Sequence, residues 1–115
     1  MSLNRPTLEK DVERKVALWA KNNGIIAIKL HGTNQKGIPD RMFGYKGRVI
    51  FIEFKRTIGG RLSLFQKTFK SKLEKSNFPV YIINNYENSI KLLKEWKGKI
   101  DAQVSSESSV NTELC

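Results

Sequence analysis

Three segments of the chain carry apolar residues at every third or fourth position, which is the spacing of a helix. The pattern predicts helices over residues 7–23, 63–76 and 86–96. Gly24 directly follows the first segment and is a typical helix terminator. The stretch after the third segment is rich in serine and poor in apolar residues, so we expect a disordered tail over residues 98–115.

Four short runs rich in β-branched and aromatic residues predict strands. They cover residues 25–30, 41–45, 48–55 and 80–83. Lys46-Gly47, between the second and third runs, is a hairpin signal, weaker than Asn-Gly because lysine disfavours a positive φ. The third run is apolar on both faces from Val49 to Phe54, which is typical of a central strand. A helix between the third and fourth runs predicts a right-handed crossover.

The size and residue usage of the chain narrow the possible classes. At 115 residues it can bury one core but not two, so we expect a single domain over residues 1–97 followed by the tail. No apolar run could span a bilayer and no secretory leader is visible, so we expect an intracellular protein without a membrane partner. With one cysteine, Cys115, and one histidine, His31, the sequence supports neither a disulfide framework nor a Cys/His zinc site.

The net charge of +10 indicates a phosphate backbone as the partner. A solvated basic surface without any ligand is the alternative. The basic residues near the candidate site in sequence are expected to follow DNA phosphates. They are Arg41, Lys46, Arg48, Arg56, Arg61, Lys67, Lys70 and Lys72.

Two acidic residues are expected to meet across the predicted hairpin. A two-residue turn at Lys46-Gly47 pairs Tyr45 with Arg48 and, counting outward, Asp40 with Glu53. Like charges that face each other are destabilising unless a cation neutralises them. Mg²⁺ prefers one or two carboxylates together with waters and phosphate oxygens, which this pair could supply. A longer turn would offset the pair, and Glu53 would then be an ordinary solvated strand end.

Lys55 is predicted to lie beside this pair, because residues two apart on a strand share a face. A lysine there can hold an attacking water or stabilise charge that develops on a phosphate. A simple ion pair between Lys55 and Glu53 is the alternative. Gly37 and Pro39 precede Asp40, and they allow a close approach of the backbone and fix its direction into Asp40.

Three motifs follow one another along the chain, and together they are much more specific than any one alone. They are Gly37-Ile38-Pro39-Asp40, Phe51-Ile52-Glu53-Phe54-Lys55 and Gly60-Arg61-Leu62-Ser63-Leu64-Phe65-Gln66. In this order they resemble the virus-type replication-repair nuclease (VRR-NUC) branch of the PD-(D/E)xK nucleases. The resemblance extends over residues 8–90 and implies an α/β fold with a restriction-endonuclease-like core, a mixed central β-sheet flanked by helices.

The resemblance also implies a metal-dependent DNA endonuclease that uses Mg²⁺, with Mn²⁺ as a substitute. In this family a glutamate of the first helix joins the metal site, and Glu13 is the matching residue here, with Glu9 as second choice. Read from the residues alone, Glu13 is equally an ordinary surface glutamate near Lys10 or Arg14. The implied metal ligands are Glu13, Asp40, Glu53 and the backbone carbonyl of Phe54, with Lys55 assisting the attacking water.

Gln66 has two interpretations that both stay open. The family assigns an active-site role to the matching glutamine. Ser63-Leu64-Phe65-Gln66 is also a capping box, in which Gln66 reaches back to the residue that caps the helix.

The resemblance further implies a homodimer that cuts branched DNA such as Holliday junctions, with two symmetric active sites. By analogy, a compact stand-alone member suggests a phage or prophage gene and action in the host cytoplasm. Two other functions stay open. The chain could be a non-catalytic basic module in which Asp40 and Glu53 serve structure alone. It could also be a sequence-specific restriction or homing nuclease, although no recognition domain is visible.

Overall fold

The fold is known from a computed structural model that describes residues 9–30, 34–55 and 61–111. This part of the chain contains three helices and four strands. In chain order they are α1 (Glu9–Asn22), β1 (Ile26–Lys29), β2 (Arg41–Tyr45), β3 (Arg48–Phe54), α2 (Leu64–Lys75), β4 (Val80–Ile83) and α3 (Tyr86–Asn111). Within these residues the helices and strands predicted from the pattern are confirmed, with one exception at the end of α3, while residues 7 and 8 of the first predicted helix lie outside the described ranges.

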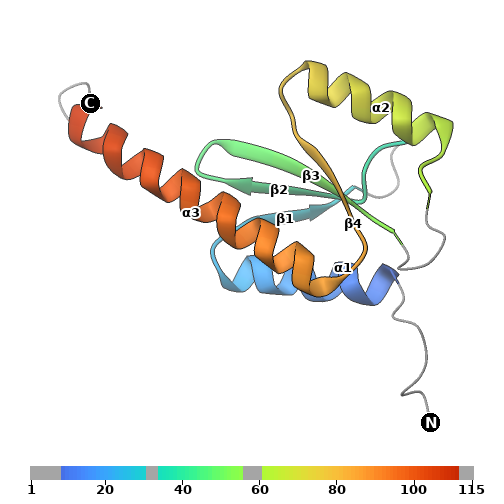
Figure 1. Cartoon of the computed structure of the whole chain (residues 1–115), viewed down its shortest axis with the longest axis horizontal. Coiled ribbons are helices and arrows are strands. Elements are labelled where there is room, and N and C mark those ends of the chain that lie inside the picture. Colours follow the sequence, from blue (N-terminus) through green and yellow to red (C-terminus); the bar gives the residue numbers. More distant parts are fainter. Residues whose placement is uncertain (1–8, 31–33, 56–60, 112–115) are drawn as a thin grey trace, which may run out of the picture.

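The strands form one mixed sheet in the order β1-β2-β3-β4. β1 to β3 are antiparallel neighbours, whereas β3 and β4 are parallel and are joined through α2. β3 is therefore internal, as its apolar run predicted. α1 and α3 lie on one side of the sheet and α2 on the other (Figure 1). This arrangement confirms the predicted α/β class with a mixed sheet flanked by helices.

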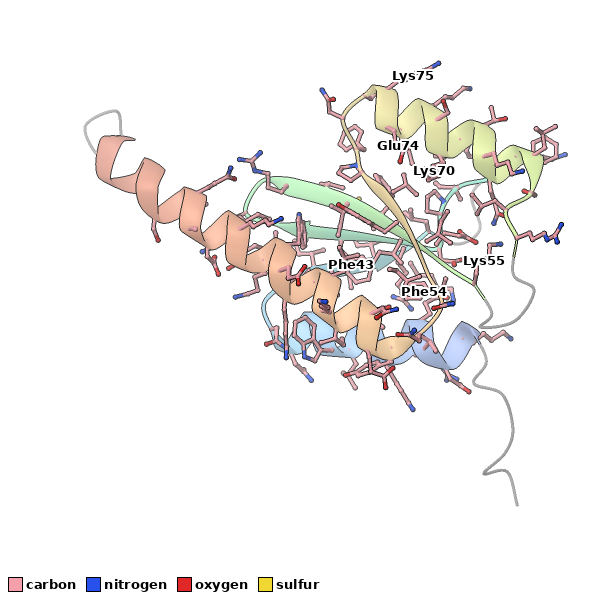
Figure 2. All side chains as sticks on the ribbon, in the orientation of Figure 1. Phe43, Phe54, Lys55, Lys70, Glu74 and Lys75 are labelled. Atoms are coloured by element: carbon pink, nitrogen blue, oxygen red, sulfur yellow. The ribbon has the colours of Figure 1, made fainter. Side chains whose placement is uncertain are left out.

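The main core lies between the sheet and the pair α1 and α3. Phe43, Ile50 and Ile52 point into it from the strands, and Val16 and Leu93 from the helices, all almost completely buried. Figure 2 shows Phe43 in this layer, between the sheet and α3. On the other side, every residue of α2 is described and none is buried. The face of the sheet beneath α2 is thus the more accessible one.

The β2–β3 hairpin has the predicted two-residue turn. Lys46 has φ 43° and Gly47 has φ 82°, and Tyr45 pairs with Arg48. The positive φ that lysine disfavours is offset by contacts to α3, because the Lys46 ammonium donates to Asp101 Oδ1 at 2.9 Å. The Tyr45 hydroxyl donates to the same oxygen at 2.6 Å. These bonds lower the pKa of Asp101 and raise that of Lys46, and they fix the turn against the helix.

The prediction of a disordered tail from residue 98 is wrong for residues 98–111, which continue α3 to Asn111. Ile100 is buried and Asp101 holds the hairpin, so the helix continues across the predicted domain boundary. Tertiary contacts stabilise a segment whose composition alone indicates disorder. Within the described ranges, none of the helices has both the length and the apolar character needed to cross a bilayer.

Candidate functional site

Asp40 and Glu53 meet at one end of the hairpin. The sheet register pairs Arg41 with Ile52, and one step further places Asp40 opposite Glu53, as the turn predicted. Asp40 Oδ2 accepts a hydrogen bond of 2.7 Å from the backbone N–H of Phe54. The Asp40 carboxylate therefore lies against the end of β3, which Phe54 and Lys55 mark in Figure 2.

Glu53 is a buried carboxyl group in which only one of the two oxygens has a partner among the described residues. Its Oε2 accepts from Gln66 Nε2 at 2.8 Å and lies 3.3 Å from the Lys55 ammonium. Its Oε1 is fully buried and has no hydrogen-bond partner among the described residues. Burial and, after it, the charge of Asp40 raise the pKa of Glu53 to about 7, although Lys55 partly opposes both effects. A buried acceptor without a partner is costly, so this oxygen is expected to take a ligand.

Gln66 completes the predicted capping box and also contacts Glu53 and Lys55. Ser63 Oγ accepts from the Gln66 backbone N–H at 3.1 Å, and Gln66 Oε1 accepts from the Ser63 N–H at 2.8 Å, which completes the capping box. The same Oε1 accepts from the Lys55 ammonium at 3.1 Å, while Nε2 donates to Glu53. One side chain thus begins α2 and orients Glu53 and Lys55.

Gly37 allows the loop before Asp40 to pack directly on α2. Its φ is +84°, and a Cβ built at this position would lie 2.1 Å from the Phe65 carbonyl oxygen and 2.8 Å from Gln66 N. The loop and the first turn of α2 also enclose a cavity of about 10 Å³ next to Glu53. This volume is enough for about one water molecule. The predicted close approach at Gly37 is therefore confirmed.

Glu13 does not join the two other carboxylates. It is buried beneath β2, where its Oε2 accepts from Arg41 Nε at 2.8 Å and lies 3.3 Å from the Lys29 ammonium. Within the described ranges, no three Asp, Glu, His or Cys side chains gather as a metal-binding group. The structure therefore uses Glu13 to hold Arg41, the residue directly after Asp40, and does not place it among metal ligands.

We expect Glu13→Ala to lower the free energy of unfolding by about 3 kcal/mol, because it leaves the Arg41 guanidinium buried without its partner. Arg41→Ala should have a similar cost, and the double variant should cost less than the sum of the two. Urea denaturation measures all three values. Asp11→Ala is the control, since its pair with Arg14 on the same helix is largely exposed and should contribute less than about 1 kcal/mol. Additive losses would contradict the pairing.

The basic residues predicted to contact DNA occupy different environments. Arg41 is buried, so the expectation that it contacts phosphates on an open surface is wrong. Lys46 and Arg48 contact Asp101 and Gln103 of α3 at the far end of β3, roughly 17 Å from Glu53 by strand rise. Lys70 pairs with Glu74 on α2 at 2.9 Å and also lines the small cavity (Figure 2). Arg61, Lys67 and Lys72 are exposed, and Arg56 lies outside the described residues.

The donors at the end of β3 fit a hard divalent cation. Asp40 and Glu53 supply carboxylates, and the buried Glu53 Oε1 has no hydrogen-bond partner among the described residues. The Phe54 N–H points to Asp40, and the carbonyl of the same strand residue faces the same side. Mg²⁺ binds through one or two carboxylates and keeps several waters, so this donor set is sufficient when waters and substrate oxygens complete it.

The comparisons with known proteins identify the fold. No family model matches the sequence, and no curated protein matches it. A solved structure named "VRR_NUC domain" matches with a TM-score of 0.67 at 20% identity, over 75% of this chain and 94% of that one. A second, named "VRR_NUC domain protein", matches with a TM-score of 0.64 at 18% identity, over 78% and 88% of the two chains. The chain therefore has the fold that its three motifs predicted.

Proposed function

We propose that this chain, which has the fold of the VRR_NUC domain, is a Mg²⁺-dependent DNA endonuclease of that family. The observation that carries the proposal is the group at the end of β3: two facing carboxylates, one with a buried unpaired oxygen, beside a lysine that a glutamine orients. Buried acceptors in folded proteins are nearly always paired, so an unpaired one supports a ligand at this position. The net charge of +10 supports DNA as the substrate, and we propose that the protein acts inside a cell.

In the proposed reaction, Asp40, Glu53 and the Phe54 carbonyl would hold the cation. When bound, Mg²⁺ lowers the pKa of a coordinated water and neutralises charge on the phosphate. Mn²⁺, with similar ligand preferences, is expected to substitute.

Lys55 acts on the water or the phosphate. Its side chain is only 16% exposed, and its ammonium touches Glu53 Oε2 and Gln66 Oε1. An ammonium carries three donors, so one remains to hold the attacking water or a phosphate oxygen. Gln66 holds the side chains of Lys55 and Glu53 in position through its hydrogen bonds. Glu13 acts indirectly, because it holds Arg41 next to Asp40.

We further propose selectivity for branched DNA, such as four-way junctions, and action as a homodimer whose two sites make paired cuts. The edge strand β1 supports a second copy as partner, since Ile26 is 60% and Ile28 is 43% exposed on its outward face. Light scattering measures the mass in solution, and a strict monomer at micromolar concentration would contradict the dimer.

The test of the function is cleavage of an immobile four-way junction beside matched duplex, flap and single-stranded DNA, each with Mg²⁺, Mn²⁺ or EDTA. We expect cutting that depends on the metal and is fastest on the junction. Binding of every substrate without cutting would indicate a non-catalytic basic module. Cutting of linear duplex at one sequence would indicate a restriction or homing nuclease.

A further inference from the structure

A groove of about 440 Å³ lies between residues 34–36 and the first two turns of α2. Phe65 and Phe69 supply aromatic rings to it, and Lys36 and Lys72 supply positive charge. We propose that this groove binds one unpaired DNA base, stacked on the ring of Phe65. The inference rests on the proposed function, because it names the feature of the substrate that is recognised beside the same site.

The exposure of Phe65 is not explained by packing. The residue is 54% exposed and its neighbour Leu64 is 76% exposed, although both begin a helix that covers the sheet. Phe69 and Leu73 point further inward and are half-buried. An aromatic ring kept at the surface, over a groove large enough for a small ligand, is typical of a binding site.

The charges around the ring suit a nucleotide. The Lys36 ammonium lies 5.0 Å from the centre of the Phe65 ring. A stacked base contributes more binding energy than an exposed cation–π contact, so a base can displace this ammonium. The displaced ammonium then remains close enough to bind the phosphate of the same nucleotide. Lys72, also in the wall, provides a second phosphate contact.

The groove and the candidate active site share one piece of backbone. Phe65 precedes Gln66, whose amide contacts Glu53 at 2.8 Å, and Gly37 packs on the Phe65 carbonyl. A base held on Phe65 therefore fixes the path of its strand relative to Lys55. Paired bases in a linear duplex cannot enter the groove, whereas bases at a branch point can unstack at lower cost. The groove thus gives a physical basis for selectivity toward branched DNA.

The experiment measures DNA binding in EDTA, so that no cleavage occurs during the measurement. Fluorescence anisotropy compares a labelled single strand of about 12 nucleotides with the matched duplex. We expect Phe65→Ala to weaken single-strand binding by about five- to a hundredfold and to leave duplex binding within about twofold. Phe65→Tyr should retain affinity. Leu64→Ala is the matched control, because it removes an exposed apolar side chain from the same groove without removing a ring, and it should have little effect.

A second readout locates the base. A single strand with 5-iodouracil, irradiated with the wild-type protein, should crosslink to the peptide that contains Phe65. Equal losses on both DNA forms, no loss with Phe65→Ala, or a crosslink elsewhere would overturn the inference. The two proposals can fail separately: a protein that crosslinks through Phe65 but cuts nothing disproves the nuclease, whereas one that cuts junctions with an unchanged Phe65→Ala variant disproves the groove.

Discussion

Glu53→Gln is expected to abolish metal-dependent cleavage and, in the same protein, to make the metal-free form more stable. Loss of a carboxylate ligand removes several kcal/mol of transition-state stabilisation, which corresponds to a fall in cleavage of about a thousandfold or more. DNA binding in EDTA should persist, because the phosphate contacts come from basic residues elsewhere. Single-turnover cleavage and anisotropy measure the two effects.

The stability gain follows from the pKa of Glu53, which burial and Asp40 raise from the ordinary 4.5 to about 7. Between these values the folded protein keeps its proton while the unfolded chain releases it. The free energy of unfolding therefore falls as the pH rises from about 4.5 to about 7, and the penalty persists above pH 7. Glutamine cannot ionise, so Glu53→Gln should raise the melting temperature at pH 8 in EDTA by on the order of 5 °C. The difference should shrink toward pH 5.

Two variants make this result specific. Glu74→Gln, in an exposed pair with Lys70 on α2, should alter neither cleavage nor the pH dependence of stability. Asp40→Asn should lose cleavage like Glu53→Gln, because it removes the facing ligand. Intact cleavage in either site variant would exclude the proposed catalytic roles. A lower melting temperature of Glu53→Gln at pH 8 would show that the carboxylate stabilises the metal-free fold.

Local rules were sufficient to predict the hairpin and the facing carboxylates. A two-residue turn fixes the register of both strands, and the register then fixes Asp40 opposite Glu53. The capping box was equally local, since Ser63 and Gln66 lie three positions apart. Local rules could not predict that Gln66 also contacts Glu53 and Lys55. Its bonds to Glu53 and Lys55 depend on where the crossover places α2 over the sheet.

The predictions for Glu13, Arg41 and the end of α3 failed for one physical reason. In each case the environment of the residue depends on a partner that is distant in the sequence. Glu13 pairs with Arg41 across 28 positions, and no local pattern distinguishes this buried pair from a surface glutamate and a phosphate-binding arginine. The end of α3 is polar, yet Asp101 is held by Tyr45 at a separation of 56 positions. The groove at Phe65 was also missed. Phe65 shares the apolar helical row of Phe69 and Leu73, so the sequence pattern does not distinguish it from a residue that packs on the sheet.

Gly37→Ala is expected to reduce both stability and cleavage, through α2. The new methyl group would lie 2.1 Å from the Phe65 carbonyl oxygen, which is backbone and cannot rotate away. Either the loop or the first turn of α2 must move by roughly 1 Å, and a displacement of this size near a catalytic group can cost about a hundredfold in rate. The added strain at positive φ should lower the free energy of unfolding by about 2 kcal/mol in total.

Gly47→Ala separates the effect of backbone strain from the effect of the steric contact with α2. Gly47 has φ +82°, nearly the same as Gly37, but a Cβ there would meet nothing within 4 Å. It should therefore cost only the backbone strain, about 1 kcal/mol, with cleavage unchanged. Equal effects of the two variants on cleavage would mean that strain alone is responsible and that the contact with α2 is irrelevant. A selective loss in Gly37→Ala would mean that the loop before Asp40 sets the position of Gln66, and through it the distance between Glu53 and Lys55.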